Sequence, residues 1–376
     1  MSKLDELINE LCPEGVEYKP LEYAFDILAG GDVPKDCFSE TRTDEFNIPI
    51  LSNGIEDKSL YGWTNKPKIE KPSLTISARG TIGWTSYRDY PFYPIVRLLV
   101  ITPKVKMNLK YVYHFMKSIE DDYNVPKVGI PQLTKPMIQN IPIPLPPLPV
   151  QEEIVRILDN FTELTAELTA ELTARKKQYE YYKNELFSKA ENAQITTLDM
   201  IAENCDSQRK PVTSGIREAG DIPYYGASGI VDYVKDYIFD GDYLLISEDG
   251  ANLLARSTPI AFSVSGKTWV NNHAHVLKFD EYATRRYVEM YLNSIDLSPY
   301  ITGAAQPKLN QKNLNNIKIP LPALHEQQRI VNILDRFDTL CNDISNGLPA
   351  EIKARQQQYE YYRDKLLTFP KAELEV

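Results

Sequence analysis

The sequence IPIPLPPLPVQEEIVRILDNFTEL runs from Ile141 to Leu164, and IKIPLPALHEQQRIVNILDRFDTL runs from Ile317 to Leu340. At a constant offset of 176 residues, 14 of these 24 positions are identical. A second block, ARKKQYEYY from Ala174 to Tyr182, matches ARQQQYEYY from Ala354 to Tyr362 in seven of nine positions at an offset of 180. Two such blocks in the same order identify an internal duplication.

Three shorter pairs of segments extend the repeat upstream with weaker similarity. They are Pro131-Gln-Leu133 with Pro307-Lys-Leu309, Ile48–Ser52 with Ile222–Gly226, and Tyr18–Leu21 with Ile195–Leu198. Each copy therefore consists of a globular part, a proline-rich strap (141–149 and 317–325) and a helix. The helices are nearly the same and the globular parts are not, which indicates a common scaffold that holds two differently specialised domains.

The helix of the first copy has one apolar seam. Its members alternate in steps of four and three when Thr165 and Arg175 fill the gaps, which is coiled-coil spacing: Ile154, Leu158, Phe161, Leu168, Leu172, Tyr179, Tyr182 and Leu186. No proline or glycine interrupts Val150 to Phe187, so we expect a helix of roughly 57 Å. A helix with one apolar seam needs a partner. We expect the second-copy helix, Glu326 to Thr368, to pack antiparallel to it and to break or kink at Asn346-Gly-Leu-Pro349.

Two features of these helices leave alternatives open. Thr165 to Leu172 repeats Thr-Ala-Glu-Leu, and one unit more or less would change the helix by about 6 Å and roughly 40°. The segment is either a spacing ruler or simply a run of good helix formers. The tyrosines of both copies are candidate partner-binding residues, and packing between helix and domain is the alternative: Tyr179, Tyr182, Tyr359 and Tyr362.

The sequence therefore predicts an α+β fold, with two mixed, strand-rich globular domains in tandem repeat, separated by two long helices forming an antiparallel coiled coil. The predicted parts are a first globular domain (1–146), a first spacer helix (147–188), a second globular domain (189–322) and a second spacer helix (323–370) broken near 346–349. Short β-type segments are Ser73–Ser77, Ile95–Ile101, Tyr243–Ser247 and His275–Phe279, and short helices are Lys110–Ile119 and Thr284–Ser294.

Composition places the chain among soluble proteins. Its 376 residues are 43% hydrophobic and 25% charged, which suits two domains. The four cysteines are far apart and the start of the chain is polar, so we expect free thiols, no structural zinc and no secretory signal. No apolar run approaches the roughly 18 residues of a membrane helix. These features predict a cytoplasmic protein.

The net charge of -10 argues against a protein that binds any polyanion indifferently. The charge is uneven, however: residues 26–140 hold 15 Lys and Arg against 13 Asp and Glu, and residues 199–316 hold 11 against 15. Such domains can bind DNA if their basic side chains share a face, or if a basic partner subunit supplies phosphate contacts.

Motifs of catalysis are missing from the sequence. Ser265-Gly-Lys-Thr268 resembles the end of a phosphate-binding loop, but Ala261 stands where that loop needs glycine. GxGxxG, HExxH, GxSxG and the Asn/Asp-Pro-Pro-aromatic motif of amino-methyltransferases do not occur. His273 and His275 would share one face of a strand and could ligate a metal, although no Cys or Asp set nearby completes a shell.

What remains suits recognition of DNA. Arginine and lysine bind phosphates or guanine, and amide and imidazole groups read base edges. Arg79-Gly-Thr81 and Ser247–Gly250 follow equivalent strands, so the tips of the two domains differ in charge. An ordinary surface role is the alternative for each candidate: Arg79, Thr81, Arg88, Arg97, Arg256, Lys267, Asn271, Asn272, His273, Gln306 and Lys308.

Both straps with the helix starts that follow them, Ile141–Ile154 and Ile317–Ile330, resemble those of the specificity (S) subunits of type I restriction–modification enzymes. Gly303–Leu309, Gly226–Gly229 and the Thr-Ala-Glu-Leu tandem are similar to segments of that family as well. The resemblance covers essentially the whole chain. The first strap departs from the usual Glu-Gln, which the second keeps.

The resemblance implies that the globular parts are target-recognition domains, each binding one half of an asymmetric, bipartite DNA sequence. The helices would separate them and dock two methyltransferase (M) subunits, with restriction (R) subunits as further partners. It implies no catalytic residue and no cofactor in this chain. S-adenosylmethionine, ATP and Mg are expected on the partner subunits, in the cytoplasm of a bacterium or archaeon.

Two functions of other classes stay open beside this one. A metal-dependent nuclease would use His273 and His275, and a coiled-coil scaffold would bind only proteins. Independently of the resemblance, a helix of ~57 Å exceeds one DNA turn of roughly 34–36 Å, so domains at its two ends could read separated half-sites.

Overall fold

The computed structural model of the chain describes residues 2–126, 129–190, 193–303 and 306–372. The chain forms two compact units, Met1–Thr169 with Glu351–Val376, and Ala170–Ala350. Each unit holds one globular part and portions of the helices of both copies. The division falls inside the Thr-Ala-Glu-Leu repeat, so the first-copy helix belongs to both units.

The elements of the first unit follow in chain order. They are α1 (Lys3–Leu11), β1 (Tyr18–Pro20), α2 (Leu21–Ala24), β2 (Phe25–Ala29), β3 (Ile48–Leu51), η1 (Glu56–Ser59), β4 (Leu60–Thr64), β5 (Ser73–Ile76), β6 (Thr85–Arg88), β7 (Tyr93–Pro94), β8 (Leu99–Pro103), α3 (Leu109–Ser118), α4 (Lys135–Ile138), β9 (Pro142–Pro144), the first part of α5 (Leu148–Ala190) and most of α11 (Leu348–Leu366).

The second unit contains the rest of α5 and the following elements. They are β10 (Gln194–Thr197), α6 (Leu198–Ile201), β11 (Glu203–Asn204), η2 (Asp206–Gln208), η3 (Ser214–Ile216), β12 (Ala219–Gly226), β13 (Gly229–Val234), β14 (Phe239–Ser247), α7 (Asn252–Ala255), β15 (Ala261–Val270), β16 (Ala274–Lys278), α8 (Tyr282–Ser294), η4 (Ser298–Tyr300), α9 (Gln311–Asn315), β17 (Lys318–Leu321) and α10 (Leu324–Asn342).

The two globular parts share one sheet topology. The second unit has a six-stranded sheet in the order β11-β16-β14-β15-β12-β13, and the first has the sheets β2-β8-β5-β6 and β4-β3-β7. β6 pairs with β5 as β15 pairs with β14, and β7 runs parallel to β3 as the end of β15 runs parallel to β12. In the first unit, β6 and β7 together take the place that the single strand β15 has in the second unit. The predicted tandem of mixed domains is therefore confirmed.

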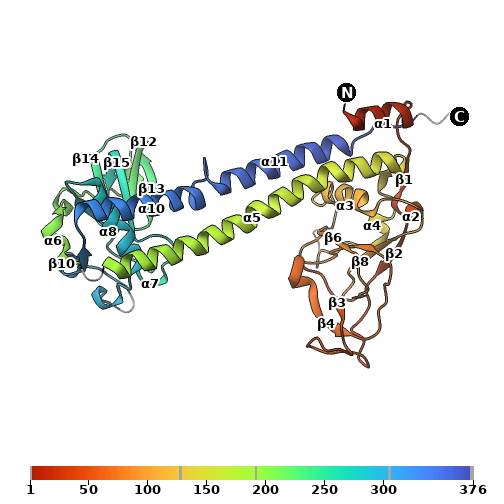
Figure 1. Ribbon diagram of the computed structural model, residues 1–376, viewed down its shortest axis with the longest axis horizontal. Coiled ribbons are helices and arrows are strands. Elements are labelled where there is room, and N and C mark those ends of the chain that lie inside the picture. Colours follow the sequence, from red (N-terminus) through yellow and green to blue (C-terminus); the bar gives the residue numbers. More distant parts are fainter. Residues whose placement is uncertain (1, 127–128, 191–192, 304–305, 373–376) are drawn as a thin grey trace. The chain divides into compact units, whose positions relative to one another are not determined.

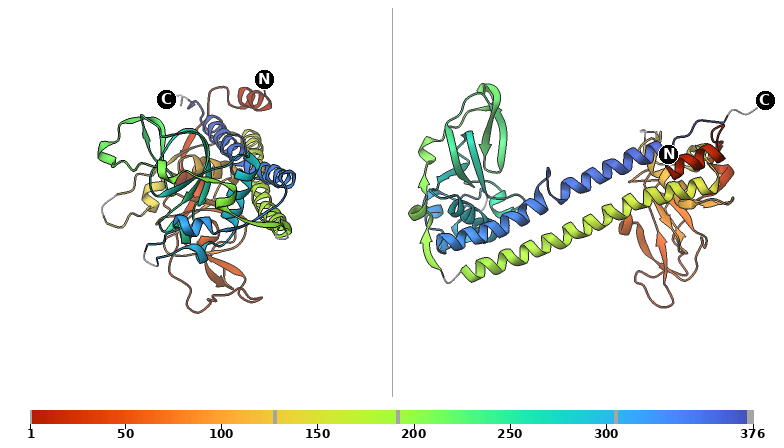
Figure 2. Two further views of the ribbon diagram at one scale, coloured as in Figure 1. Left: turned by 90° about the vertical axis from the view of Figure 1, so that its left-hand side faces the viewer. Right: turned by 45° about the horizontal axis from the view of Figure 1, so that its top comes forward.

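Both faces of each sheet are covered. In the first unit, Leu74 and Ile76 pack toward α3, while Val100 packs with Phe92 and Leu98 on the other face. In the second unit α8 takes the place of α3 (Figures 1 and 2). Burial on two faces explains why all four residues of β5 are buried, Ser73 and Thr75 included, and why β14 contains a continuous apolar run from Tyr243 to Ile246.

The expected strand from Ile95 to Ile101 is wrong in its first half. Val96 and Arg97 have φ angles of 52° and 63°, and β8 starts only at Leu99. The chain turns here because Val96 N donates to Gly31 O at 2.8 Å and Arg97 N donates to Gly30 O at 3.1 Å. The apolar pattern alone could not reveal this turn.

A tyrosine of the covering helix binds the strap in each unit. The buried Tyr111 hydroxyl donates to Pro144 O at 3.1 Å, and the buried Tyr287 hydroxyl donates to Pro320 O at 2.7 Å. These residues correspond at the 176-residue offset of the repeat. Proline has no N–H group, so the strap depends on such side-chain donors for part of its hydrogen bonding.

A glutamine at the start of the spacer helix repeats this arrangement. Gln151 Nε2 donates to Pro146 O, and Gln327 Nε2 donates to Pro322 O, both at 2.7 Å. The Oε1 atom of each glutamine accepts a hydrogen bond from the start of the covering helix, from Asn108 N or Thr284 Oγ1. One amide therefore joins strap, spacer helix and covering helix in both copies.

The spacer helices pair within each unit. Phe161 of α5 stacks on Tyr362 of α11 with ring centroids 5.4 Å apart, and Phe337 of α10 stacks on Tyr182 of α5 at 5.7 Å. Within each unit the two helices run side by side in opposite directions (Figures 1 and 2). The antiparallel packing that the seam predicts is therefore found in both units.

The second-copy helix is interrupted between Asn342 and Leu348. Asp343 Oδ1 accepts hydrogen bonds from Ser345 N at 2.7 Å and Asn346 N at 3.1 Å. A Cβ atom on Gly347 would lie 2.5 Å from Thr339 O, so only glycine fits there. Among the helices of the described ranges, none is both long enough and apolar enough to cross a membrane.

We expect Tyr287→Phe to lower the free energy of unfolding by about 1 kcal/mol, because the buried hydroxyl loses its bond to Pro320 O. Urea unfolding of the full chain measures this. Tyr233→Phe is the matched control because Tyr233 is 52% exposed. Equal destabilisation by both changes would contradict the assigned role of the strap bond.

Candidate nucleic-acid interface

Strand register relates the loops of one unit to those of the other. In the first sheet Ile76 of β5 pairs with Leu99 of β8, and in the second Ile246 of β14 pairs with His275 of β16. The loops that follow β5 and β14, and those that precede β8 and β16, are therefore equivalent. Eight sequence-predicted candidates lie in them or in the adjoining segment before the strap: Arg79, Thr81, Arg97, Asn271, Asn272, His273, Gln306 and Lys308.

The equivalent positions carry different side chains. We call Asn53, Arg79, Arg97 and Gln132 the first loop cluster, and Ala227, Asp249, His273 and Lys308 the second loop cluster. Two backbone bonds correspond between them: Leu133 N donates to Ala78 O at 2.9 Å, and Leu309 N donates to Glu248 O at 2.7 Å. The same loops therefore meet in both units.

An asparagine holds the first loop cluster together. Asn53 Oδ1 accepts from Ala78 N at 2.7 Å, and Asn53 Nδ2 donates to Val96 O at 2.8 Å. These bonds bring the residues preceding Arg79 and Arg97 to one side chain. Arg79 also donates to Gln132 Oε1 through Nε at 3.0 Å and Nη2 at 2.5 Å. Two candidate arginines that stand 18 positions apart in the chain thus belong to one surface.

The turn that carries Arg97 is strained. A positive φ is rare for a β-branched residue such as Val96, and each such residue costs of order 1–3 kcal/mol. Gly30 lets the turn approach, since a Cβ atom there would lie 2.8 Å from the Ile95 backbone. Strain of this kind is common where a side chain must be aimed at a ligand, and the Arg97 side chain is exposed.

The second loop cluster has mixed charge. His273 Nδ1 lies 2.9 Å from both carboxylate oxygens of Asp249. Lys308 Nζ lies 3.1 Å from Glu248 Oε1. In the second unit Glu248 N donates directly to His273 O at 2.9 Å. In the first unit the Asn53 side chain lies between the equivalent loops and bonds to both. The two clusters therefore share a frame and differ in chemistry.

An ionic network lies beneath the second loop cluster. The buried His275 places Nδ1 2.6 Å from Asp206 Oδ2 and donates from Nε2 to Leu309 O at 2.7 Å. Arg209 Nη1 lies 2.6 Å from Glu248 Oε2. In the first unit Leu99 occupies the position of His275, so the equivalent place is apolar.

This network differs from the two-histidine metal site of the nuclease hypothesis, because His273 is not part of it. Ligand atoms of Asp206, Glu248 and His275 lie within 4.8 Å of one another, but Asp206 and Glu248 already hold His275 and Arg209. His273 is exposed and bound to Asp249 instead. The two histidines therefore lie in separate environments.

Three further candidates of the second unit lie close to its loop cluster. Asn271 is buried, and its Oδ1 accepts from His273 N at 2.8 Å. Asn272 and Gln306 are exposed. Of the Gly303–Leu309 motif, Ala304 and Ala305 lie outside the described residues.

Three candidates lie away from the loop clusters or within the protein. Arg88 ends β6 and binds hydroxyl groups. Lys267 lies in β15 with Nζ 4.5 Å from the centre of the Tyr237 ring. The Thr81 hydroxyl is buried and has no hydrogen-bond partner among the described residues.

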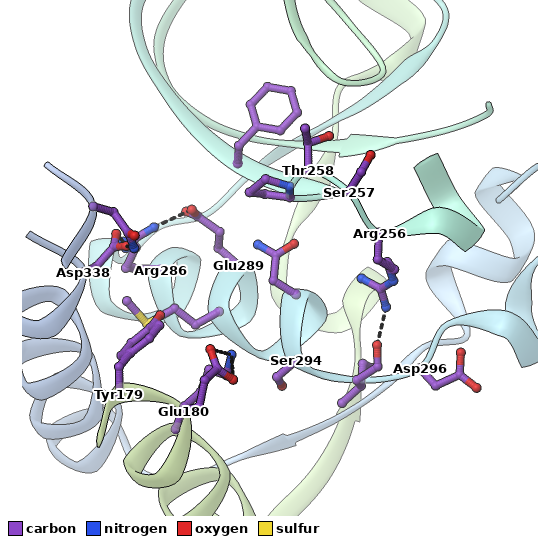
Figure 3. A pocket seen from close by; sticks show the side chains of 17 residues that line it. Tyr179, Glu180, Arg256, Ser257, Thr258, Arg286, Glu289, Ser294, Asp296 and Asp338 are labelled. Atoms are coloured by element: carbon purple, nitrogen blue, oxygen red, sulfur yellow. Dashed lines mark hydrogen bonds and ion pairs between the residues drawn. The ribbon is translucent and has the colours of Figure 1, made fainter. Parts of the chain in front are cut away.

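Arg256 serves the fold in this structure. Its guanidinium donates to Leu292 O and Ile295 O at the end of α8, which places a cation at a helix C-terminus. Figure 3 shows this side chain directed at that helix end. Burial lowers the pKa of Arg256, against the opposing charge of Asp296.

The cavity drawn in Figure 3 has a volume of about 700 Å3 and lies in the second unit between α8, α10 and the end of α5. Its charged groups bind one another: Arg286 pairs with Glu289, and its Nη2 lies 2.7 Å from Asp338. Burial raises the pKa of Glu289 although Arg286 opposes this. Trp84 has the position in the first unit that Ile260, beside this cavity, has in the second. Lys117 Nζ lies 3.7 Å from the centre of the Trp84 ring.

The candidate tyrosines take part in packing. Tyr182 and Tyr362 form the interhelical stacks and still expose 39% of their surface. Tyr179 contacts Phe337. The Tyr359 hydroxyl lies 3.0 Å from His114 Nδ1. Tyr181 and Tyr361, which belong to the same tyrosine clusters, are more exposed, at 63% and 61%.

Sequence reasoning also missed several residues of the site. Asn53 stands before a glycine in a turn, and the Asn-Gly dipeptide is a turn signal that could have found it. Gln132 stands opposite Lys308 in the repeat, which could have marked it. Asp206 and Arg209 lie in and after a short 3-10 helix, and no motif announces them.

We expect the network beneath the second loop cluster to lose its stabilising effect in acid. Burial alone would raise the pKa values of Asp206 and Glu248, but His275 and Arg209 hold both below their ordinary values. A lowered carboxyl pKa stabilises the fold above the unfolded value, near pH 4, and this contribution disappears as the pH falls through the folded value.

Glu248→Gln should therefore lower unfolding stability by roughly 1–3 kcal/mol at pH 7 and by much less at pH 3. Denaturant unfolding between these pH values measures the difference. Glu203→Gln is the control because Glu203 is exposed. A stability difference that is constant with pH would show that the carboxylate charge is not what matters.

The comparisons with known proteins agree with this arrangement. The family model described as type I restriction modification DNA specificity domain matches residues 13–175 and again 191–354. The chain is 33% identical over 365 residues to the EcoR124I/EcoR124II specificity subunit of Escherichia coli, covering 88% of this chain and 89% of that one. It is 32% identical over 386 residues to a putative type I restriction enzyme specificity subunit of Haemophilus influenzae, covering 94% and 96%.

The fold agrees as well. The crystal structure of a type I restriction–modification S subunit from M. genitalium superimposes with a TM-score of 0.64 at 17% identity, over 94% of this chain and 96% of that chain. The family predicted from the straps is confirmed by two tandem matches and by relatives aligned over most of their length. The chain therefore belongs to the type I restriction–modification DNA specificity family, as a non-catalytic specificity subunit with two specificity domains in tandem.

Proposed function

We propose that each loop cluster reads one half of an asymmetric, bipartite DNA target. One observation carries the proposal: the same loops meet on the same frame in both units but present different side chains. A duplicated frame with unlike tips is what two unlike half-sites require. Family membership supports DNA as the ligand, and the loops are where the two domains differ in charge.

The first loop cluster suits guanine. An arginine guanidinium can donate two parallel hydrogen bonds to O6 and N7 of guanine in the major groove. Arg97 is exposed and forms no ion pair among the described residues. Arg79 is oriented by Gln132 and keeps further N–H groups. The first half-site therefore contains at least one guanine read by these arginines.

The second loop cluster suits a base that presents an amino group. A carboxylate such as Asp249 accepts from cytosine N4 and repels phosphate. His273, held against it, adds a polar edge, and Lys308 supplies a cation. The ionic network under these loops fixes their positions, so the second half-site is read chiefly by directed hydrogen bonds.

The helices suit two identical partners. Tyr181 and Tyr361 are exposed to nearly the same extent, as are Tyr182 and Tyr362. We propose that each copy docks one methyltransferase subunit beside its tyrosines. The methyltransferases would bind S-adenosylmethionine, and restriction subunits, where they join, would use ATP and Mg, all in the bacterial or archaeal cytoplasm.

Arg97→Ala should relax recognition in the first half-site only, and His273→Ala in the second only, because each side chain belongs to one loop cluster. Losing a good base contact should reduce discrimination at that position by roughly ten- to hundredfold. Methylome sequencing of a host that expresses each variant with its methyltransferase checks this. Bipartite methylation that persists without this chain, or a change in both half-sites from one variant, would refute the proposal.

An additional Thr-Ala-Glu-Leu unit after Leu172 should lengthen the unread gap between the half-sites. Four residues add about 6 Å to a helix, close to two base-pair steps. The same methylome experiment reads the gap directly. Exchanging Thr165 and Thr169 for alanine keeps the length and serves as the control, and an unchanged gap in the lengthened variant would reject the ruler role.

A further inference from the structure

A cavity of about 780 Å3 opens beside β4 in the first unit. Aromatic, basic and amide side chains line it, among them Trp63, Tyr90, Arg42, Arg88 and Asn47. Except for Arg88, none of these residues was a candidate from the sequence. All come from the first globular part, between residues 42 and 91, and all are described by the structure.

Arg88 is held at this cavity without a counter-ion. Its Nη1 donates to the Tyr90 hydroxyl at 2.9 Å, its Nη2 to Ser59 Oγ at 3.2 Å and its Nε to Thr75 Oγ1 at 3.3 Å. Ser59 and Thr75 are 3% and 2% exposed. Among the described residues no carboxylate lies within ion-pair distance of Arg88. Two of its five N–H groups remain for a ligand.

An aromatic surface lies at the same cavity. Trp63 is half-buried in β4, and the Arg42 guanidinium lies 5.3 Å from the centre of its ring. Tyr90 is 37% exposed. Planar rings and guanidinium groups are the surfaces on which unstacked bases pack. Glu56 and Asp57, which also line the cavity, can accept hydrogen bonds from an exocyclic amino group.

The cavity adjoins the first loop cluster through one segment. Residues 52–59 carry Asn53 at one end and the cavity residues Glu56, Asp57 and Ser59 at the other, and Ser52 N donates to Ser59 O at 2.8 Å. Glu56 has a φ of 50°. In the second unit the equivalent connection between β12 and β13 is only Ala227–Ser228, so this wall belongs to the first unit.

We propose that this cavity binds one nucleotide of the target DNA, turned out of the helical stack beside the first half-site. The base packs against Trp63 and Tyr90, and Arg88 binds its acceptor edge or its phosphate. An aromatic plane beside an uncompensated guanidinium is the chemistry that recognises a nucleotide. The inference rests on the proposed function, because it takes the first loop cluster to be a DNA-reading surface.

Binding to mismatched DNA tests the proposal, because base extrusion and direct readout predict opposite changes in affinity. A protein that turns a base out binds more tightly when that base is already unpaired, whereas direct readout loses affinity at a mismatch. The probe is a set of duplexes, each with one mismatch in or beside the first half-site, bound to the chain in complex with its methyltransferase. We expect one position where the mismatch tightens binding roughly tenfold, and we expect this gain to vanish in Trp63→Ala and to shrink in Arg88→Gln.

Tyr61→Ala is the control because Tyr61 lies on the same strand, is 52% exposed and contacts Phe38 instead. Unchanged recognition of the second half-site shows that a variant is folded. Weaker binding at every first-half mismatch overturns the proposal. The proposal is also overturned if the mismatch still tightens binding in Trp63→Ala, since the gain in affinity would then come from the methyltransferase. Free deoxynucleotides that bind through Trp63 without any mismatch effect would assign the cavity to a mononucleotide and overturn the DNA assignment. Failure of the proposed function is distinct, because then no bipartite sequence is bound specifically.

Discussion

Hydrogen bonds to the straps are what the rest of the structure depends on. A chain segment rich in proline lacks N–H groups and cannot tie itself to its surroundings by backbone bonds alone. Tyr111 and Gln151 in one copy, and Tyr287 and Gln327 in the other, donate to strap carbonyls. Through these bonds the strap, the spacer helix and the covering helix become one rigid joint. Both copies keep this joint because removing any donor leaves a polar group unsatisfied in a buried place.

A joint fixed in this way leaves the loops free to differ. The loop clusters depend on the frame through backbone bonds such as those of Leu133 and Leu309, which any side chain at the neighbouring positions allows. Arg97 and His273 can therefore occupy one position of the frame, and Gln132 and Lys308 another. The supporting layer differs too, since Leu99 stands where His275 stands in the second unit. Changing the chemistry of a tip thus requires a few side chains and no change of topology.

The sequence predicts the frame better than the tips. Repetition at a fixed offset, apolar periodicity and the Gly-Leu-Pro interruption are local patterns, and they predict the tandem domains, the paired helices and the broken second helix. The tips depend on contacts between distant segments. The turn at Val96 interrupts an apolar run that predicts a strand, and it is held by hydrogen bonds from Val96 N and Arg97 N to the carbonyl oxygens of Gly31 and Gly30. Asn53, Asp206 and Arg209 act on residues 25 to 70 positions away, which no local pattern reveals. Arg256 carries a charge that suits DNA, yet its surroundings direct it to a helix end.

The distribution of charge explains how a chain with a net charge of -10 can bind a polyanion. In the first unit the guanidinium groups of Arg88 and Arg97 have no carboxylate partner among the described residues, so their charge is available to DNA. In the second unit Arg209 and Lys308 neutralise Glu248, and His273 faces Asp249. Cations that already pair with carboxylates release few counterions when they meet DNA. Raising the salt concentration therefore weakens the binding of such a domain to DNA only slightly. Under the proposed function, affinity for the first half-site would therefore arise more from charge, and recognition of the second more from directed hydrogen bonds. Under the proposed function, a subunit built in this way would take much of its phosphate contact from its methyltransferase partners, and tight binding would depend on assembly.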